Sequence, residues 1–376
     1  MSDLYDSNVP IAWQPDSRYL ESANLTHFMR RLRVGSYEEL YQRSIEDVAW
    51  FTEEVLKYLD IRFSTPYKQV MDNSKGIPWT RWCVGGKMNI VDNCLDKNMG
   101  TPQENEPALG WEGEEGTVRW LTYRDLWRLV NQTANGLRAL GARKGDVVGL
   151  FMPMVPETVA ALLATAKIGG IILPLFSGYG SGAVATRLQD ADARFLFTAD
   201  GLSRRGKLVN LKLIADDAAA QSPNLEHVII YNRLGLSIPM QPGRDHTWED
   251  LVLSQPEVAE SERTDADDPV MIIYTSGTTG RPKGTIHTHC GFPVKSTQDM
   301  AFGTDVHPGE RVYWVTDMGW MMGPWLSFGS LLRRGTMILY DGAPDYPGPD
   351  RLWSLIERHR ITTLGISPTL VRALIP

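Results

Sequence analysis

The chain has 376 residues, of which 43% are apolar and 22% are charged. It is therefore long enough to bury a large core and has the composition of a globular protein. Its net charge of −7 argues against a general surface for nucleic acid or anionic membrane, so we expect neither partner. The three cysteines, Cys83, Cys94 and Cys290, lack CxxC spacing, which indicates a reducing compartment and no structural zinc.

The sequence shows no pattern typical of export or of membrane insertion. The first residues lack a basic region followed by an apolar core, so we expect no signal peptide. The most apolar long stretch, residues 155–176, contains Glu157, Lys167 and Pro174. It is more typical of a buried helix that leads into a strand than of a membrane span. We therefore expect a cytoplasmic protein.

Residues 1–110 differ in pattern from the rest of the chain. Apolar residues at helical spacing predict helices over residues 23–34 and 36–59. A stretch rich in tryptophan and glycine follows at residues 79–86. Residues 100–116 combine prolines with several glutamates, which predicts a surface loop or linker.

From Thr117 onward the patterns of strand and helix alternate. Thr122 and Asp125 stand at capping-box spacing and predict a helix that continues to Leu140, where Gly141 ends it. Such alternation predicts an α/β fold with largely parallel sheets flanked by helices. The further predicted strands are 146–152, 171–176, 194–198, 228–231, 270–274, 312–315 and 337–340, and the further helices are 156–168, 182–190 and 349–358.

The segment Thr275–Gly284 follows the predicted strand at 270–274 and is rich in glycine, threonine and positive charge. Glycines let backbone N–H groups approach a ligand, while hydroxyls and cations suit the oxygens of a polyphosphate. An ordinary surface turn explains the chemistry about equally well. The segment is not a Walker A loop, because Gly284 follows Lys283 where that motif has Ser or Thr. The candidate phosphate ligands are Thr275, Ser276, Gly277, Thr278, Thr279, Gly280 and Lys283.

Residues 274–284 resemble the signature of the adenylate-forming (AMP-binding) superfamily, and residues 79–96 resemble the N-terminal extension of acetyl-CoA synthetase-like enzymes. The resemblance implies the large N-terminal domain of that fold, with layers in an αβαβα-like order. It implies an extension over residues 1–110 and a synthetase core over residues 111–376. The implied reaction activates a short- to medium-chain carboxylic acid with ATP and Mg²⁺, through an acyl-adenylate, and transfers the acyl group to coenzyme A.

The same resemblance implies roles for residues outside the phosphate loop. It places Arg204 and Lys207 at the phosphates of coenzyme A, and Asp345 where coenzyme A passes. It also implies that an acyl pocket is formed by Trp320, Met321 and Met322. Acetate-specific members of the family usually carry small or β-branched residues at the two methionine positions. The acid is therefore left open within the short and medium chain lengths.

The resemblance covers the first part of the family's architecture. We find no Gly-Glu-Pro adenine-binding segment, no Thr-Glu motif for Mg²⁺ and no C-terminal lid with its catalytic lysine. The catalytic residue is therefore unknown. We expect the 376-residue chain to be a shortened, inactive form of the ligase, with weak nucleotide binding at best.

Two other functions remain open at this stage. Gly178, Gly180 and Ala183 fit a relaxed dinucleotide fingerprint, with Asp200 downstream, as in an NAD(P)-dependent oxidoreductase. A non-catalytic nucleotide-binding module is the second alternative. His287 and His289 share one side of a predicted strand as metal ligands do, but no third ligand is evident, so we expect no metal site.

Overall fold

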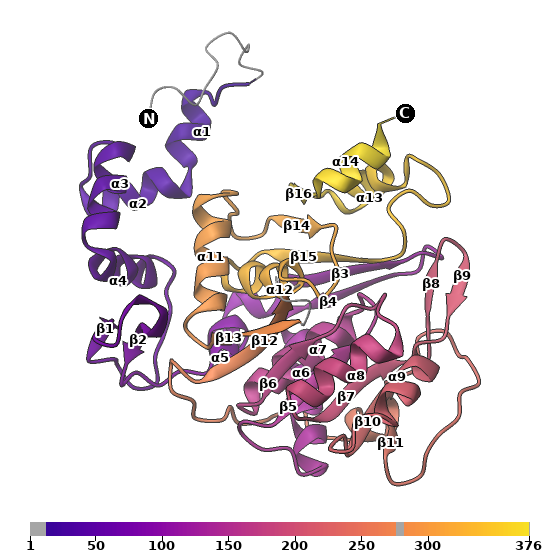
Figure 1. Cartoon of the computed structure of the whole chain (residues 1–376). Helices are drawn as coiled ribbons and strands as arrows, with labels where there is room; N and C mark the ends of the chain where they lie inside the picture. Colours follow the sequence, from indigo (N-terminus) through magenta and orange to yellow (C-terminus); the bar gives the residue numbers. More distant parts are fainter. Residues whose placement is uncertain (1–12, 276–281, 376) are drawn as a thin grey trace.

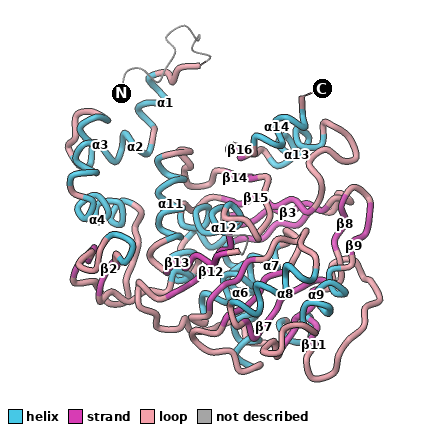
Figure 2. Tube along the Cα trace, viewed as in Figure 1, coloured by secondary structure: helices cyan, strands magenta, loops and turns pink. Residues whose placement is uncertain are grey.

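The computed structural model describes residues 13–275 and 282–375. It contains two mostly parallel sheets with helices between them and on their outer faces (Figures 1 and 2). The predicted α/β class is thereby confirmed. No helix in the described residues is both long and apolar enough to cross a membrane.

The larger sheet has seven strands, and its first six run parallel. The central strands are buried on both faces, because side chains of alternate residues point to opposite helix layers. In β5, Val148 and Leu150 belong to the core shared with the inner helices, whereas Val147 and Phe151 contact the outer helices. The strands in sheet order are β11 (Asp245–Thr247), β10 (His227–Tyr231), β7 (Ala193–Ala199), β5 (Val147–Phe151), β6 (Ile171–Pro174), β12 (Pro269–Thr275) and the antiparallel edge strand β13 (Lys283–Thr288).

The smaller sheet has five strands, of which β16 (Thr363–Gly365), β14 (Arg311–Trp314), β15 (Thr336–Asp341) and β3 (Pro107–Gly113) are parallel and β4 (Val118–Thr122) is antiparallel. The prediction of a surface loop over residues 100–116 is wrong, because this segment contains the short helix η3 (Pro102–Asn105) and the buried strand β3. The glutamates suggested exposure, but Glu112 is fully buried. The expected boundary at residue 110 stays a prediction, although β3 crosses it.

Five helices fill the space between the sheets, and two pairs cover the outer faces. The inner helices are α5 (Ile90–Cys94), α6 (Tyr123–Ala139), α7 (Pro156–Lys167), α11 (Phe292–Phe302) and α12 (Met322–Leu332). Helices α8 (Ser181–Asp190) and α9 (Leu211–Ala219) cover the larger sheet, and α13 (Arg351–His359) and α14 (Pro368–Leu374) pack on the smaller one. The short helix α10 (Trp248–Val252) packs beside α6. The predicted capping box of Thr122 and Asp125 begins α6.

The N-terminal region forms a separate group of helices beside this layered body (Figure 1). Residues 36–59 are helical as their spacing predicts, but they form two helices. Asp47 leaves helical geometry between them and caps the second by accepting a hydrogen bond from Trp50 N at 2.9 Å. The elements are α1 (Ser17–Ser22), α2 (Asn24–Leu32), α3 (Tyr37–Glu46), α4 (Val48–Tyr58), β1 (Gln69–Asp72), η1 (Ile77–Trp79), β2 (Arg81–Val84) and η2 (Asp96–Asn98).

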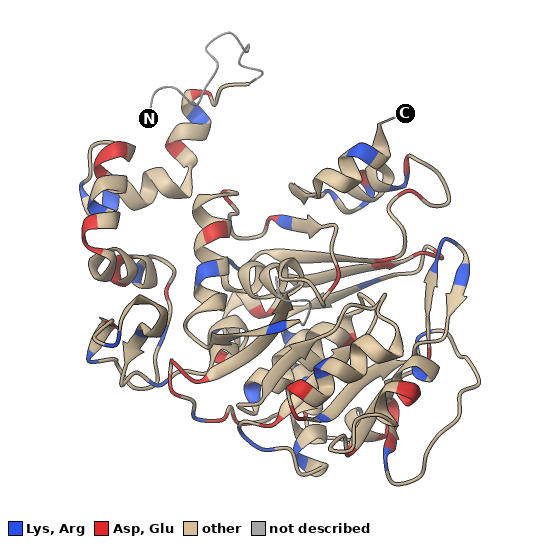
Figure 3. Cartoon of the chain, in the orientation of Figure 1, with Lys and Arg blue, Asp and Glu red and all other residues tan. Residues whose placement is uncertain are grey.

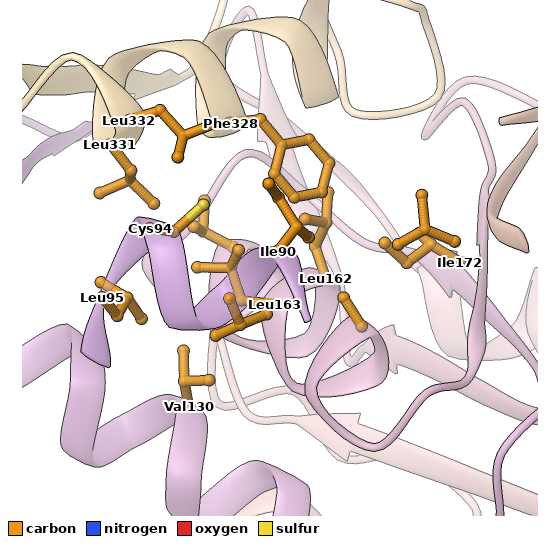
Figure 4. Close-up of a cluster of buried hydrophobic side chains, with 14 of the residues drawn as sticks. Ile90, Cys94, Leu95, Val130, Leu162, Leu163, Ile172, Phe328, Leu331 and Leu332 are labelled. Atoms are coloured by element: carbon orange, nitrogen blue, oxygen red, sulfur yellow. The ribbon is translucent and has the colours of Figure 1, made fainter. Parts of the chain in front are cut away.

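Helix α5 connects this N-terminal region to the centre of the molecule. Figure 4 shows Ile90, Cys94 and Leu95 between residues of α6 and α7 on one side and residues of α12 on the other. The side-chain amide of Asn89 donates to the carbonyl oxygens of Ala166 (2.9 Å), Lys167 (3.1 Å) and Glu262 (3.2 Å). The first two of these bonds satisfy carbonyl groups at the end of α7, and the third joins that end to the segment of Glu262.

A buried histidine joins the same region to the turn after β13. His289 is fully buried, and its Nδ1 accepts a hydrogen bond from Ile90 N at 3.3 Å. Burial lowers the pKa of His289 from 6.5 to about 4, because it disfavours the charged ring. Between these pH values the unfolded chain binds more protons than the folded one, so stability falls as the pH falls.

We predict that His289→Gln removes this pH dependence. Relative to the variant, the wild type should lose roughly 3 kcal/mol of unfolding free energy between pH 7 and pH 4. Urea denaturation of both proteins at a series of pH values measures the difference in unfolding free energy. Parallel curves for the two proteins over this range would contradict the assignment.

Candidate active site

A cleft of about 790 Å³ opens where the carboxyl ends of parallel strands from both sheets meet. In open α/β sheets this edge is where ligands bind. The segments after β5 and β6 form one side, and the ends of β14 and β15 with the residues after β16 form the other. The lining residues are Pro153, Met154, Phe176, Ser177, Leu202, Arg204, Arg205, Tyr313, Trp314, Val315, Thr316, Asp317, Trp320, Met322, Tyr340, Asp341, Gly342, Ala343, Pro344, Ser367 and Thr369.

The buried carboxylate of Asp317 connects the two sheets at the floor of this cleft. It follows β14 and accepts hydrogen bonds from Ser177 Oγ (2.6 Å) and Ser177 N (3.3 Å) after β6, and from Gly319 N (2.8 Å). Burial raises the pKa of Asp317, and these hydrogen bonds oppose the rise. The carboxylate therefore fixes the distance between the two strand ends.

Gly319 is required for this close approach. A Cβ atom at this position would lie 2.0 Å from Phe176 N and 2.3 Å from Phe176 Cα. These are backbone atoms, so the clash cannot be relieved by a change of rotamer. Only glycine fits here without separating the sheets.

A second carboxylate, Glu114, organises the other end of the cleft. It follows β3 and holds the turn of a hairpin made of β8 (Leu202–Arg204) and β9 (Lys207–Val209) against the segment after β15. Its donors are Ser203 Oγ (2.9 Å) and the backbone N–H groups of Arg205 (3.0 Å), Gly206 (2.8 Å) and Ala343 (2.9 Å). Burial alone would raise the pKa of Glu114, but the backbone donors lower it below its usual range. The sequence did not single out Glu114, because it stands in the segment predicted as a loop.

The hairpin places two arginines and a lysine beside the cleft, where Figure 3 shows a cluster of positive charge. Arg204 lines the cleft and donates to the carbonyl oxygen of Gly342 at 2.8 Å. Lys207 is exposed and pairs with Arg204 across the hairpin. Arg205, which the sequence did not single out, forms an ion pair with Asp345 at 2.9 Å. The structure therefore brings together the three predicted coenzyme A residues, Arg204, Lys207 and Asp345.

Asp341 is a further buried carboxylate of the cleft, at the end of β15. Burial raises the pKa of Asp341 to about 6, although Arg233 Nε donates to it at 2.9 Å. Its charge therefore depends on pH near neutrality. An anionic ligand would encounter less negative charge here at pH 5 than at pH 7.

Two of the three predicted acyl-pocket residues line the cleft. Trp320 stands against Phe176 with ring centroids 5.4 Å apart, and Met322 begins α12 beside it. Met321 is not among the lining residues and is 53% exposed. The wall on this side is therefore apolar and formed by an aromatic ring and an adaptable thioether.

The predicted phosphate loop begins at the same edge of the larger sheet. Strand β12 runs parallel to β6, so Thr275 lies at the edge from which Phe176 and Ser177 enter the cleft. Thr275 pairs with Lys283 across the β12–β13 hairpin, and both are exposed. The other candidates, Ser276, Gly277, Thr278, Thr279 and Gly280, lie outside the described residues.

The surroundings of Asp200 disfavour the dinucleotide alternative. The turn with Gly178 and Gly180 does lead from β6 into α8, but β6 and β7 are separated by β5. The Asp200 carboxylate is buried and accepts hydrogen bonds from four backbone N–H groups, so it does not face a ribose. The donors are Gly201 (2.7 Å), Arg233 (2.8 Å), Leu234 (3.0 Å) and Leu236 (2.8 Å).

The two candidate metal-binding histidines do not share a strand face. His287 lies in β13 beside Thr285 Oγ1 at 3.3 Å, whereas His289 lies in the following turn and contacts Ile90. Across residues 13–275 and 282–375, no group of three or more His, Cys, Asp and Glu side chains is placed to hold a metal ion.

A fold with a cleft at converging sheet ends is common to many ligand-binding α/β proteins, and comparison with known families defines the class. Residues 96–376 match the family described as AMP-binding enzyme, and residues 37–94 match the acetyl-coenzyme A synthetase N-terminus. The chain therefore belongs to the AMP-binding enzyme family. The resemblance to acetyl-CoA synthetase-like members is confirmed.

Individual relatives agree with this assignment. The chain is 38% identical to the acetyl-coenzyme A synthetase of Methanothrix thermoacetophila over 94% of its length, and 41% identical to that of Pyrobaculum arsenaticum over 90%. It spans 53% and 52% of these relatives, about half of their length. The structure of acetoacetyl-CoA synthetase from Streptomyces lividans matches 96% of the chain and 56% of its own length, with 33% identity and a TM-score of 0.89.

We predict that Gly319→Ala destabilises the protein by more than about 3 kcal/mol, since the added methyl group overlaps backbone atoms of Phe176. Gly182→Ala is the matched control, because its added methyl group meets nothing within 4 Å and alanine favours the helix α8. Unfolding in urea measures both variants. Equal midpoints for the two would show that the sheets are not held together at this contact.

Proposed function

We propose that these residues serve an AMP-forming carboxylate–CoA ligase that activates a short- to medium-chain carboxylic acid. The observation that supports this most strongly is the cleft itself. In a chain of the AMP-binding enzyme family, it combines an apolar wall, a cationic hairpin and the start of a hydroxyl-rich loop at one edge. The relatives named above act on acetyl or acetoacetyl groups, which are short acyl chains.

In the first proposed step, an oxygen of the carboxylic acid attacks the α-phosphorus of ATP and pyrophosphate departs. This reaction needs the charge on the departing pyrophosphate to be stabilised and the attacking oxygen to be positioned. We assign the first task to the loop bounded by Thr275 and Lys283. The apolar wall of Trp320 and Met322 would hold the acyl chain, with Met321 on its outer side.

In the second proposed step, the thiol of coenzyme A attacks the acyl carbonyl carbon and AMP departs. Arg204 and Lys207 would bind the phosphates of coenzyme A, and a guanidinium fits a phosphate better than an ammonium does. Asp345 Oδ1 is buried and accepts no hydrogen bond from the described part of the chain. An amide N–H of the pantetheine arm is a suitable donor for it.

Mg²⁺ is part of the proposal only as a companion of the nucleotide. The described residues contain no ready group of metal ligands, and Mg²⁺ commonly binds through substrate phosphates and waters with one or two carboxylates. We therefore assign no residue of this chain to the metal. A cytoplasmic location likewise stays a prediction.

Titration calorimetry of the 376-residue chain with ATP, coenzyme A and NADH tests the proposed ligands. We expect saturable binding of coenzyme A, weak binding of ATP and none of NADH. Binding of NADH without coenzyme A or ATP would contradict the proposal. Acid-dependent exchange of labelled pyrophosphate into ATP, measured with C2 to C8 acids, tests the separate expectation that this chain alone is inactive.

Substitutions in the hairpin test the coenzyme A site. Arg204→Ala should weaken coenzyme A binding about tenfold and Lys207→Ala by a few-fold, because a guanidinium can bind two phosphate oxygens at once. Arg204→Lys separates charge from geometry. Lys295→Ala is the control, because the Lys295 side chain on α11 is exposed. Unchanged affinity in both hairpin variants would exclude these residues from the coenzyme A site.

A further inference from the structure

Two cysteines that are far apart in the sequence meet in the structure. Cys83 lies in β2 of the N-terminal region, and Cys290 lies in the turn after β13. The Cys83 thiol lies close enough to the Cys290 thiol to affect its pKa. Both side chains are reduced and nearly buried, with 2% and 6% of their surfaces exposed. Neither residue belongs to the cleft, so the proposed ligase chemistry does not use them.

The backbone around the pair holds the two thiols in place. Ala266 N donates to the carbonyl oxygen of Gly86 at 2.9 Å, and Cys290 N donates to the carbonyl oxygen of Ala266 at 2.9 Å. Through Ala266, these two hydrogen bonds link the turn after Cys83 to Cys290. The Cys290 thiol also lies 3.8 Å from the carbonyl oxygen of Trp82, the neighbour of Cys83.

Cys83 has an unusual backbone conformation, with a φ of 51°. A left-handed conformation is uncommon for a residue with a Cβ atom and persists only where surrounding contacts maintain it. Here Gly86 N donates to the carbonyl oxygen of Cys83 at 2.9 Å and closes a tight turn. The position of the Cys83 thiol is therefore set by the fold and not by a mobile loop.

We propose that Cys83 and Cys290 form a reversible intramolecular disulfide when the protein meets a two-electron oxidant such as hydrogen peroxide. Each thiol loses its hydrogen and one S–S bond forms. The peroxide accepts two electrons and two protons and leaves as two molecules of water. A dithiol reductant restores both thiols by exchange. A disulfide of this kind requires two neighbouring thiols. Cys94 has no such neighbour, since it lies in the apolar core among Leu331 and Leu332 (Figure 4).

The disulfide would join two segments of the chain that match different family models. Cys83 lies within the segment that matches the acetyl-coenzyme A synthetase N-terminus, and Cys290 lies within the segment that matches the AMP-binding enzyme. Cys290 is two residues beyond β13, and the opposite end of β13 is Lys283. The bond would tie the N-terminal region to the hairpin that carries Thr275 and Lys283. A cross-link of such long range restricts the unfolded chain strongly.

The surroundings also set the rate of the reaction. The contact with Cys83, together with burial, raises the pKa of Cys290 above its usual range. The thiolate is the reactive form, so oxidation should be slow at neutral pH and faster in alkaline solution. The pair is therefore suited to sustained oxidation and not to fast peroxide sensing.

Treating the folded 376-residue chain with hydrogen peroxide and then counting thiols in denaturant tests the proposal. The wild type should fall from three thiols to one, and peptide mapping should find Cys83 joined to Cys290 with the loss of two hydrogens. Dithiothreitol should restore all three. The oxidised chain should stay monomeric on a non-reducing gel and unfold at a higher temperature than the reduced chain.

Three variants keep the result interpretable. Cys94→Ala should still lose both of its thiols, whereas Cys83→Ser and Cys290→Ser should each keep two. Folding of every variant is checked by its circular dichroism before oxidation. A link that involves Cys94, a disulfide between two chains, or an unchanged thiol count after prolonged oxidation at pH 8.5 would each overturn the proposal.

Discussion

The buried carboxylate of Asp317 holds the carboxyl ends of the two sheets together, and the cleft depends on this contact. It accepts hydrogen bonds from both the hydroxyl and the backbone N–H of Ser177, which follows β6 of the larger sheet. Gly319 then lies directly against the backbone of Phe176. Burying a charge is costly unless hydrogen bonds compensate it. The three donors to Asp317 provide that compensation. The geometry of the cleft therefore depends on the contact between the ends of β6 and β14 and on the absence of a Cβ atom at Gly319.

A carboxylate that accepts several hydrogen bonds also organises the cationic side of the cleft. Arginines near one another repel, and a hairpin with a glycine turn has little intrinsic rigidity. Glu114 accepts three hydrogen bonds from the turn, donated by Ser203 Oγ, Arg205 N and Gly206 N, and a fourth from Ala343 N after β15. Asp345 holds Arg205 from the other side. Arg205 is thus held in an ion pair with Asp345, whereas Arg204 lines the cleft.

Local patterns were sufficient for most of the fold but not for all of the site. Strand–helix alternation after Thr117 and the capping box at Thr122 predict elements correctly, because short-range periodicity and hydrogen bonding determine them. Strand β3 was missed, since its one glutamate, Glu112, is paired with Arg351 and Arg358 of α13 and hydrogen-bonded to His359 of the same helix. The role of Glu114 and the meeting of Cys83 with Cys290 depend on contacts between distant segments. A pattern read along the chain carries no signal for such contacts.

The central claim is that one cleft, built by the ends of both sheets, receives the ligands. Hydrogen–deuterium exchange with and without coenzyme A tests it most directly. We predict slower exchange in residues 202–209 and 340–346, with little change in residues 178–190. Slower exchange confined to residues 178–190 and the end of β7, with none at the hairpin, would contradict the account.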